Sequence, residues 1–235
     1  MTKKAEIITF GCRLNIYESE ILKQGVKEHE VKNTSIFNSC AVTAESVRQV
    51  KQSIRKRRRE FPEEKIVVTG CAAQIEPETF SKMQEVDLVS GNIEKRDILN
   101  ILSKEKNSKK IEVQNIMETR QSLNGLTDGY DNRSRAFIEI QNGCDHRCTF
   151  CIIPFGRGNS VSKSVKNIIN EINLMIEKGH KEIVLTGVDI ASWGHDLDKK
   201  SNLGFLVKKI LQGSPDLTRL KLSSMDVIGF DDELL

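Results

Sequence analysis

The chain has few aromatic residues, little net charge and no long apolar run. Aromatic side chains make up 5% of its 235 residues, and its formal net charge at pH 7 is +3. No apolar run approaches the length that spans a bilayer, and the first ten residues lack the apolar stretch of a secretory signal. A hydrophobic content of 38% excludes a disordered chain. These features predict a cytoplasmic globular protein of one large or two modest domains, and its charge permits an anionic partner without requiring one.

Short β-rich runs alternate with helical patterns along the chain. In the first part, the runs cover residues 5–10, 34–38, 65–69 and 86–90, and the helical patterns cover 14–26, 44–61, 76–82 and 95–103. In the last part, the runs cover 136–141, 182–186 and 219–223, and the helical patterns cover 165–178 and 203–211, with a further start at Asp231. Strands that alternate with helices of this length predict parallel sheets with helical crossovers.

A polar stretch separates the two series. It runs from residue 104 to 135, is rich in Lys, Asn, Gln, Ser and Asp, and has room for one more strand at 110–114. We therefore expect an α/β protein in which residues 1–104 form an open parallel sheet with flanking helices. Residues 105–134 would form a connector, and residues 135–235 would form a second, incomplete βα unit.

Three cysteines follow the first three predicted strands. Cys12, Cys40 and Cys71 each come directly after a Gly or Ser that ends a short apolar run. The carboxyl ends of parallel strands lie along one edge of a sheet, where ligands bind, so we expect these cysteines to converge. Cysteines in a reducing compartment are more often metal-binding or catalytic than disulfide-bonded. The pattern fits a shared metal site or three buried free cysteines, and zinc remains an alternative although no fourth ligand is evident.

The other three cysteines form a dense cluster after the first strand of the second series. Cys144, Cys148 and Cys151 have the spacing C-x3-C-x2-C. Three thiolates in one loop can hold three irons of a cubane cluster and leave the fourth iron open as a reaction site. A zinc site that uses His146 as its fourth ligand is the alternative. Otherwise Asp145 and His146 are expected to be solvated loop residues.

Longer strings around all six cysteines resemble one enzyme family. The spacing C-x3-C-x2-C, with Phe150 before the last cysteine, resembles the signature of the radical S-adenosylmethionine enzymes, whose fold is a partial (βα) barrel. The strings that resemble the methylthiotransferases of that superfamily are FGCRLN (10–15), NSCAVT (38–43), TGCAAQ (69–74) and QNGCDHRCTFCIIP (141–154). The strings GCRLN (11–15) and LTGVDIASWG (185–194) are most similar to the branch that acts on threonylcarbamoyladenosine at position 37 of tRNA. The resemblance implies an N-terminal sheet followed by an incomplete radical-SAM barrel.

The resemblance also implies cofactors and a reaction. An auxiliary [4Fe-4S] cluster would be held by Cys12, Cys40 and Cys71, and a radical-generating [4Fe-4S] cluster by Cys144, Cys148 and Cys151. The auxiliary cluster would carry a sulfur that one S-adenosyl-L-methionine methylates. The second cluster, reduced by a donor such as a flavodoxin or ferredoxin, would generate a radical from another S-adenosyl-L-methionine. The methylthio group would then be transferred to C2 of the adenine ring in tRNA, with no evident need for a protein acid or base.

Several alternatives to this function stay open. Sister branches of the family act on isopentenyladenosine in tRNA or on an aspartate of a ribosomal protein. A non-catalytic remnant that keeps cluster or RNA binding and a zinc-stabilised binding module are further alternatives. The relatives continue through further βα units and usually a small RNA-binding domain. We therefore expect that this chain is C-terminally truncated, or completed by a second polypeptide, and has little or no activity alone.

The resemblance assigns further residues to the cosubstrate. It places Phe150, Gly187 and Asp189 where the superfamily contacts S-adenosyl-L-methionine, although Asp189 would also suit a helix N-cap. Arg157 and Lys163 follow the cysteine loop and could meet a phosphate or the cosubstrate carboxylate, or lie on the surface.

A dense basic run, RKRRR, occupies residues 55–59 at the end of the predicted helix 44–61. Cations are favoured at a helix C-terminus, so a solvated helix end is the default interpretation. Contact with the tRNA backbone is the alternative.

Overall fold

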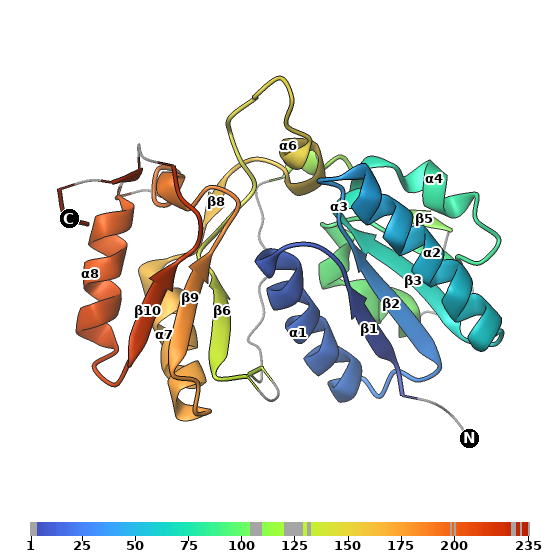
Figure 1. Cartoon of the computed structure of the whole chain (residues 1–235), viewed down its shortest axis with the longest axis horizontal. Coiled ribbons are helices and arrows are strands. Elements are labelled where there is room, and N and C mark those ends of the chain that lie inside the picture. Colours follow the sequence, from blue (N-terminus) through green and yellow to red (C-terminus); the bar gives the residue numbers. More distant parts are fainter. Residues whose placement is uncertain are drawn as a thin grey trace.

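Two parallel sheets lie on either side of one helix, α1 (Figure 1). The computed structural model describes residues 4–103, 110–119, 129–130, 133–197, 199, 201–226, 229–230 and 232–234. The first sheet contains, in spatial order, the parallel strands β1 (Glu6–Thr9), β2 (Thr34–Ser39), β3 (Lys65–Gly70), β4 (Leu88–Ser90) and β5 (Ile111–Glu112). Its helices are α1 (Arg13–Glu28), α2 (Ala44–Glu60), α3 (Cys71–Ile75), α4 (Pro77–Ser81) and α5 (Ile98–Ser103), with the short turns η1 (Glu94–Arg96) and η2 (Ile116–Glu118).

The first sheet is covered on both faces by helices. One apolar layer, which includes residues of α2 and α4, comprises Phe37, Val50, Ile54, Ile66, Val68 and Phe80. The other, which includes residues of α1 and α5, comprises Leu22, Val26, Ile36, Val67, Leu88 and Ile98. Neighbouring residues such as Ile36 and Phe37 enter opposite layers because side chains alternate along a strand. Since both faces are buried, the strands are continuous apolar runs in the sequence.

The second sheet has three parallel strands in the order β10-β9-β6. Its strands are β6 (Arg135–Glu139), β9 (Glu182–Thr186) and β10 (Arg219–Leu222), and a short antiparallel pair joins β7 (Gln141–Asn142) to β8 (Val161–Ser162). The helices are α6 (Ile153–Arg157), α7 (Val165–Glu177) and α8 (Leu203–Gly213), with the turn η3 (Ile190–Ser192). The side chains of Ser164 and Asn202 cap the first turns of α7 and α8, respectively.

The predicted α/β class and its parallel strands are confirmed. The strand expected at 110–114 forms as β5 and pairs with β4, so part of the predicted connector belongs to the first sheet. The short helices α3 and α6 and the β7–β8 pair were not predicted. The helix start expected at Asp231 lies outside the described residues, and residues 232–234 form a turn. In the described ranges, no helix combines the length and apolar character that a membrane span requires.

Helix α1 contributes to the cores of both sheets. Its Tyr17 is fully buried in the apolar cluster of the second sheet, and its Leu22 and Val26 are buried in a layer of the first. One side of α1, with Ile16, Tyr17 and Ile21, therefore packs against the second sheet, and another side, with Leu22 and Val26, packs against the first. This shared helix fixes the position of one sheet relative to the other.

A buried polar group lies where α1 meets the second sheet. Lys163 donates from Nζ to the Tyr17 hydroxyl over 2.6 Å, and its Nζ lies 3.4 Å from Glu171 and 4.0 Å from Glu139. Glu139 is fully buried, and Asn142 donates to its Oε2 over 2.9 Å. Burial raises the pKa of Glu139 from an ordinary 4.5 to about 7, although the Lys163 ammonium opposes this shift.

Substituting Glu139→Gln should change the pH dependence of stability. Between pH 4.5 and about 7 the folded chain keeps a proton on Glu139 that the unfolded chain has lost, so stability falls as the pH rises through this range. The variant lacks this titration, so its stability relative to the parent should be higher at pH 8 than at pH 5, by at most about 3 kcal/mol. Urea unfolding at the two pH values measures this difference.

Glu63→Gln removes an exposed glutamate and serves as the matched control. An equal effect of Glu139→Gln at pH 5 and pH 8 would contradict the burial of an acid with a raised pKa.

Candidate metal centres

Cys12, Cys40 and Cys71 follow three neighbouring strands at the same edge of the first sheet. The three cysteines lie just beyond the carboxyl ends of β1, β2 and β3, which are adjacent in the sheet. Burial raises the pKa of the Cys40 thiol, and the nearby Cys71 and Cys12 thiols raise it further. Cys40 is buried, Cys71 is partly buried and Cys12 is exposed. The expected convergence is thus present in the arrangement of the strands and in the mutual influence of the thiols.

The small residues before these cysteines allow the strand ends to approach one another. Gly11 has a φ of +92°, and a Cβ on it would lie 2.5 Å from the Cβ of Cys40. Gly70 has a φ of +93°, and a Cβ there would lie 2.4 Å from the carbonyl oxygen of Ser39. Both positions require glycine for their backbone conformation and for space. The space beside each glycine is taken by the neighbouring strand end.

Cys144, Cys148 and Cys151 occupy a loop after β6 and β7 that the next segment holds in place. The Cys144 amide donates to the Gly158 carbonyl over 3.1 Å, and the Ser160 amide donates to Asp145 over 2.9 Å. Arg147 donates from its guanidinium to the Cys144 carbonyl and to the Asn159 side chain, both over 2.6 Å. Asp145 therefore fixes the loop and is more than a solvated residue.

Burial raises the pKa of the Cys144 thiol, and the charges of Asp189, Cys151 and Cys148 raise it further. Cys144 therefore lies within electrostatic range of the other two thiols of the second set.

Helix α3, which begins at Cys71, packs against α6, which follows the second cysteine loop (Figure 1). Cys71 is the first residue of α3, and a Cβ on Gly156 of α6 would lie 3.1 Å from its Cβ. Asn92 donates to the Gly156 carbonyl over 2.5 Å, and its Nδ2 lies 3.9 Å from the Cys71 sulfur. Cys71 of the first set therefore lies beside the segment that follows the second cysteine loop.

Arg157 and Lys163 are both buried and do not reach the surface. Arg157 donates from Nη1 to Glu18 over 2.6 Å and from Nε to the Cys71 sulfur over 3.2 Å. Lys163 lies in the group with Tyr17 described above. Neither the surface role nor a contact with phosphate that we expected is supported, because both cations already have protein partners.

The three residues assigned to the cosubstrate lie in different settings. Asp189 precedes η3, where Ser192 donates to its Oδ2 over 2.6 Å, and the same oxygen lies 3.2 Å from His146 Nε2. A Cβ on Gly187 would lie 2.8 Å from the Gln141 carbonyl oxygen, so packing alone explains this glycine. The Phe150 side chain is 89% exposed, beside Cys151.

Further large apolar side chains are exposed near both cysteine sets. Val42, close to Cys40, is 57% exposed, and Phe155 of α6 is 55% exposed. Exposed apolar side chains at a site rimmed by polar groups are typical of a binding surface.

The six cysteines offer sulfur donors of one chemical kind. Among the described residues, no group of three or more His, Cys, Asp or Glu side chains could hold one metal ion. His146, the fourth zinc ligand that we considered, contacts Asp189 instead. Each set offers three cysteine sulfurs, the soft donors that iron–sulfur clusters require. The residues of each set thus suit a cluster of this kind.

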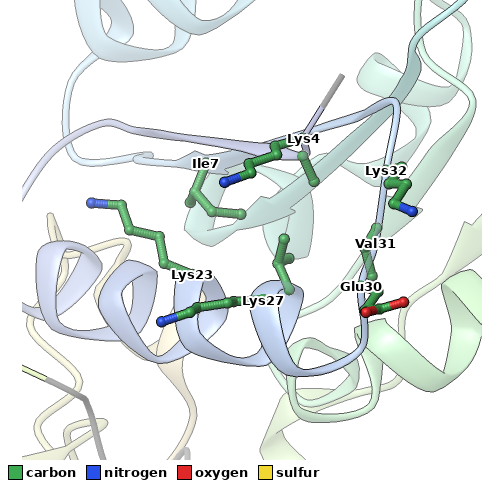
Figure 2. Close-up of a pocket in the computed structure, with 9 residues that line it drawn as sticks. Lys4, Ile7, Lys23, Lys27, Glu30, Val31 and Lys32 are labelled. Atoms are coloured by element: carbon green, nitrogen blue, oxygen red, sulfur yellow. The ribbon is translucent and has the colours of Figure 1, made fainter. Parts of the chain in front are cut away.

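A basic pocket lies at the other end of α1 (Figure 2). It has a volume of about 420 Å³ and an apolar floor that includes Ile7 and Val31. Four lysines and one glutamate line it: Lys4, Lys23, Lys27, Lys32 and Glu30. The residues of α1 that line it, Lys23, Val26 and Lys27, lie 10–14 residues after the helix start at Arg13, so about 15–21 Å of helix separates the pocket from Cys12. Sequence reasoning missed this pocket, since its lysines are dispersed along the chain.

The basic run at 55–59 lies at the same end of the sheet, away from the cysteines, because α2 runs back from β2 to the start of β3. Arg57 is paired with Glu64 and Glu6, each over 2.7 Å, and Arg58 with Asp87 over 2.5 Å. Much of this run is therefore engaged in ion pairs within the chain.

Two protein families match separate parts of the chain. Residues 4–91 match a family described as uncharacterized protein family UPF0004, and residues 138–220 match the radical SAM superfamily. The first match contains Cys12, Cys40 and Cys71, and the second contains the other three cysteines.

Named relatives match almost the whole chain. A threonylcarbamoyladenosine tRNA methylthiotransferase MtaB from Rickettsia prowazekii (strain Madrid E) is 45% identical over 98% of this chain and 54% of its own length. The protein of the same name from Aquifex aeolicus (strain VF5) is 34% identical over 99% of this chain and 58% of its own length. A tRNA-2-methylthio-N(6)-dimethylallyladenosine synthase from Pelagibacter ubique (strain HTCC1062) is 30% identical over 100% of this chain and 56% of its own length. The chain thus spans about half the length of the curated relatives that it matches.

A solved structure has the same fold. The radical S-adenosylmethionine methyltransferase TsrM from Kitasatospora setae, with cobalamin and a [4Fe-4S] cluster bound, superimposes with a TM-score of 0.62 at 14% identity. The alignment covers 99% of this chain and 58% of that protein. With two matched families, three cysteines in each match and relatives named as methylthiotransferases, the chain belongs to the radical S-adenosylmethionine methylthiotransferase family.

Proposed function

We propose that this chain carries the two iron–sulfur centres of a tRNA methylthiotransferase that acts on N6-threonylcarbamoyladenosine at position 37. Cys12, Cys40 and Cys71 would hold the auxiliary [4Fe-4S] cluster, and Cys144, Cys148 and Cys151 would hold the radical-SAM cluster. The observation that carries the proposal is the contact between α3 and α6, which brings Cys71 beside the segment that follows the second cysteine loop. When bound, the second cluster and S-adenosyl-L-methionine supply a radical that activates the C2–H bond of adenine, and the first cluster supplies the methylthio sulfur.

The protein's own residues would position the reactants and exclude water. The exposed Phe150 ring is available to stack on an adenine, either of the cosubstrate or of the tRNA. Asp189, held by Ser192 and His146 and next to the second cysteine loop, would orient the cosubstrate through its carboxylate. An electron donor of the flavodoxin or ferredoxin type would reduce the second cluster.

The choice of threonylcarbamoyladenosine rests on relatives that bear this substrate in their names. The dimethylallyladenosine branch also matches, at lower identity, so it is the alternative substrate class. Because the chain spans about half the length of these relatives, activity requires a test in a context that supplies the remaining length.

Iron content tests the two sites directly. Anaerobic reconstitution of the chain should give a brown protein with about eight irons, since each cubane contains four. Alanine substitution of either cysteine set should leave about four irons and a cluster spectrum. Iron analysis with electron paramagnetic resonance measures this, and a colourless, zinc-binding protein would contradict the proposal.

Activity is tested with a chimera. This chain is joined to the part of the 45% identical Rickettsia relative that it does not match, and the product is reconstituted with iron and sulfide. With a low-potential reductant, we expect cleavage of S-adenosyl-L-methionine and a methylthio group on threonylcarbamoyladenosine in tRNA, measured by nucleoside mass spectrometry.

The controls for the chimera are the same protein with Cys12→Ala and a tRNA that carries isopentenyladenosine. Cys12→Ala should abolish methylthio transfer while leaving cleavage of S-adenosyl-L-methionine. Methylthiolation of the isopentenyladenosine tRNA alone would reassign the substrate, and cofactor cleavage without any tRNA product would reject the proposed function.

The lysine pocket at the far end of α1 would contact the tRNA backbone away from the modified base. Its four lysines exceed its one glutamate, and its distance from the cysteines suits a phosphate in the anticodon arm (Figure 2). The double substitution Lys27→Ala with Lys32→Ala should reduce the slope of log affinity against log salt concentration by about one to two units.

The matched control is Lys208→Ala with Lys209→Ala, two exposed lysines on α8. Both slopes are measured by filter binding of tRNA at salt concentrations from about 50 to 300 mM. Equal slopes for the two double variants would exclude the pocket from the tRNA interface.

A further inference from the structure

Arg157 connects the second cysteine loop to the first cysteine set. Its guanidinium is 3% exposed and has protein acceptors on all three nitrogens. Nε donates to the Cys71 sulfur over 3.2 Å, Nη1 donates to Glu18 over 2.6 Å, and Nη2 donates to the side-chain oxygen of Asn15. Arg157 lies six residues after Cys151, whereas its partners belong to α1 and α3.

Asn15, one of the partners of Arg157, also binds the backbone at the ends of the other two strands. The Asn15 side chain donates to the Phe10 carbonyl over 2.7 Å and to the Ser39 carbonyl over 3.0 Å, close to Cys12 and Cys40. Arg157 therefore touches Cys71 directly and reaches the backbone next to the other two cysteines through one side chain. A displacement of Arg157 would disturb all three.

The charges of the buried group formed by Arg157, Lys95 and Glu18 do not cancel. Glu18 is 4% exposed and accepts from both Arg157 and Lys95, the latter over 2.8 Å. Two cations thus share one carboxylate, and one positive charge remains beside the Cys71 sulfur. Hydrogen bonds and positive charge near cluster sulfurs favour the reduced form, which carries more negative charge.

We propose that Arg157 is a positioning residue that stabilises the reduced state of the cluster on Cys12, Cys40 and Cys71 and fixes that cluster relative to the second cysteine loop. The inference rests on the proposed function, because it requires a cluster at the first set. Arginine is needed because its planar guanidinium donates hydrogen bonds to three acceptors in three directions at once. A lysine would keep the charge but lose this geometry.

The experiment isolates the first cluster. In a background in which Cys144, Cys148 and Cys151 are alanines, the variants Arg157→Gln and Arg157→Lys are reconstituted anaerobically. Iron is counted, and the midpoint potential is measured by a redox titration followed with electron paramagnetic resonance. Arg157→Gln should shift the potential to more negative values, with about a tenfold lower ratio of reduced to oxidised cluster, or about 59 mV for one electron. The midpoint potential of Arg157→Lys should lie between those of Arg157→Gln and the parent.

A second variant gives a shift of opposite sign. Glu18→Gln removes the shared negative charge and keeps Arg157, so the potential should move to more positive values. If Arg157 only supported the fold, Arg157→Gln and Glu18→Gln would not shift the midpoint potential in opposite directions. This variant, with Arg157→Lys, decides the question if Arg157→Gln does not fold. Arg219→Gln, whose guanidinium is 72% exposed and distant from the cysteines, is the matched control and should leave the potential unchanged.

The outcomes separate this inference from the proposed function. If the background protein binds no iron at the first set, the proposed function fails. If all variants bind iron equally and the potentials of Arg157→Gln and Glu18→Gln equal that of the parent, the role of Arg157 is overturned while the cluster site stands.

Discussion

The buried ion group of Arg157, Glu18 and Lys95 is the constraint on which the arrangement of the two sites depends. Its members come from α6, α1 and η1, so it joins the second cysteine loop to both the shared helix and the first sheet. Removing these charges from water is unfavourable, and such a group persists when its geometry and its hydrogen bonds are well satisfied. Here the carboxylate has two cations, and although burial alone would raise the pKa of Glu18, Arg157 and Lys95 lower it to about 2. The group therefore contributes more to fixing one arrangement of the sheets than to net stability.

Both cysteine sets lie at edges where parallel strands end. Each cysteine of the first set follows the carboxyl end of its own strand, and the second set follows β6 and β7, where crossover loops are free to carry function. Helix α3 begins directly after β3 and α6 begins at Ile153, just after Cys151, and because each is only five residues long they contact each other without lengthening the fold. Glycines at 11, 70 and 156 remove the side chains that would keep the loops apart. The same packing contacts thus determine both the fold and the position of the cysteine loops.

Much of this could be predicted from the sequence, because buried parallel strands leave a clear apolar signal. The ranges of β2, β3 and β9 and the placement of all six cysteines followed from local patterns. Helices α3 and α6 could not be predicted because five residues are too few to show a helical period. The pairing of Arg157 with Glu18 joins residues 139 positions apart, and a single sequence gives no measure of such contacts. One signal was present: Glu18 lies four residues from both Leu14 and Leu22, on the apolar face of α1, where a carboxylate needs a buried cation.

The sharing of α1 between two cores has a consequence for how such proteins diversify. Because Tyr17 completes the packing of the second sheet while Leu22 and Val26 complete that of the first, neither sheet carries a full set of its own helices. If recombination exchanged one sheet and its helices between distant lineages, the product would have an unfilled space against β6 or an α1 with no matching surface. The two halves are therefore expected to be inherited as a matched pair, with new substrate preferences arising through loops at the cysteine edge rather than through swapped units.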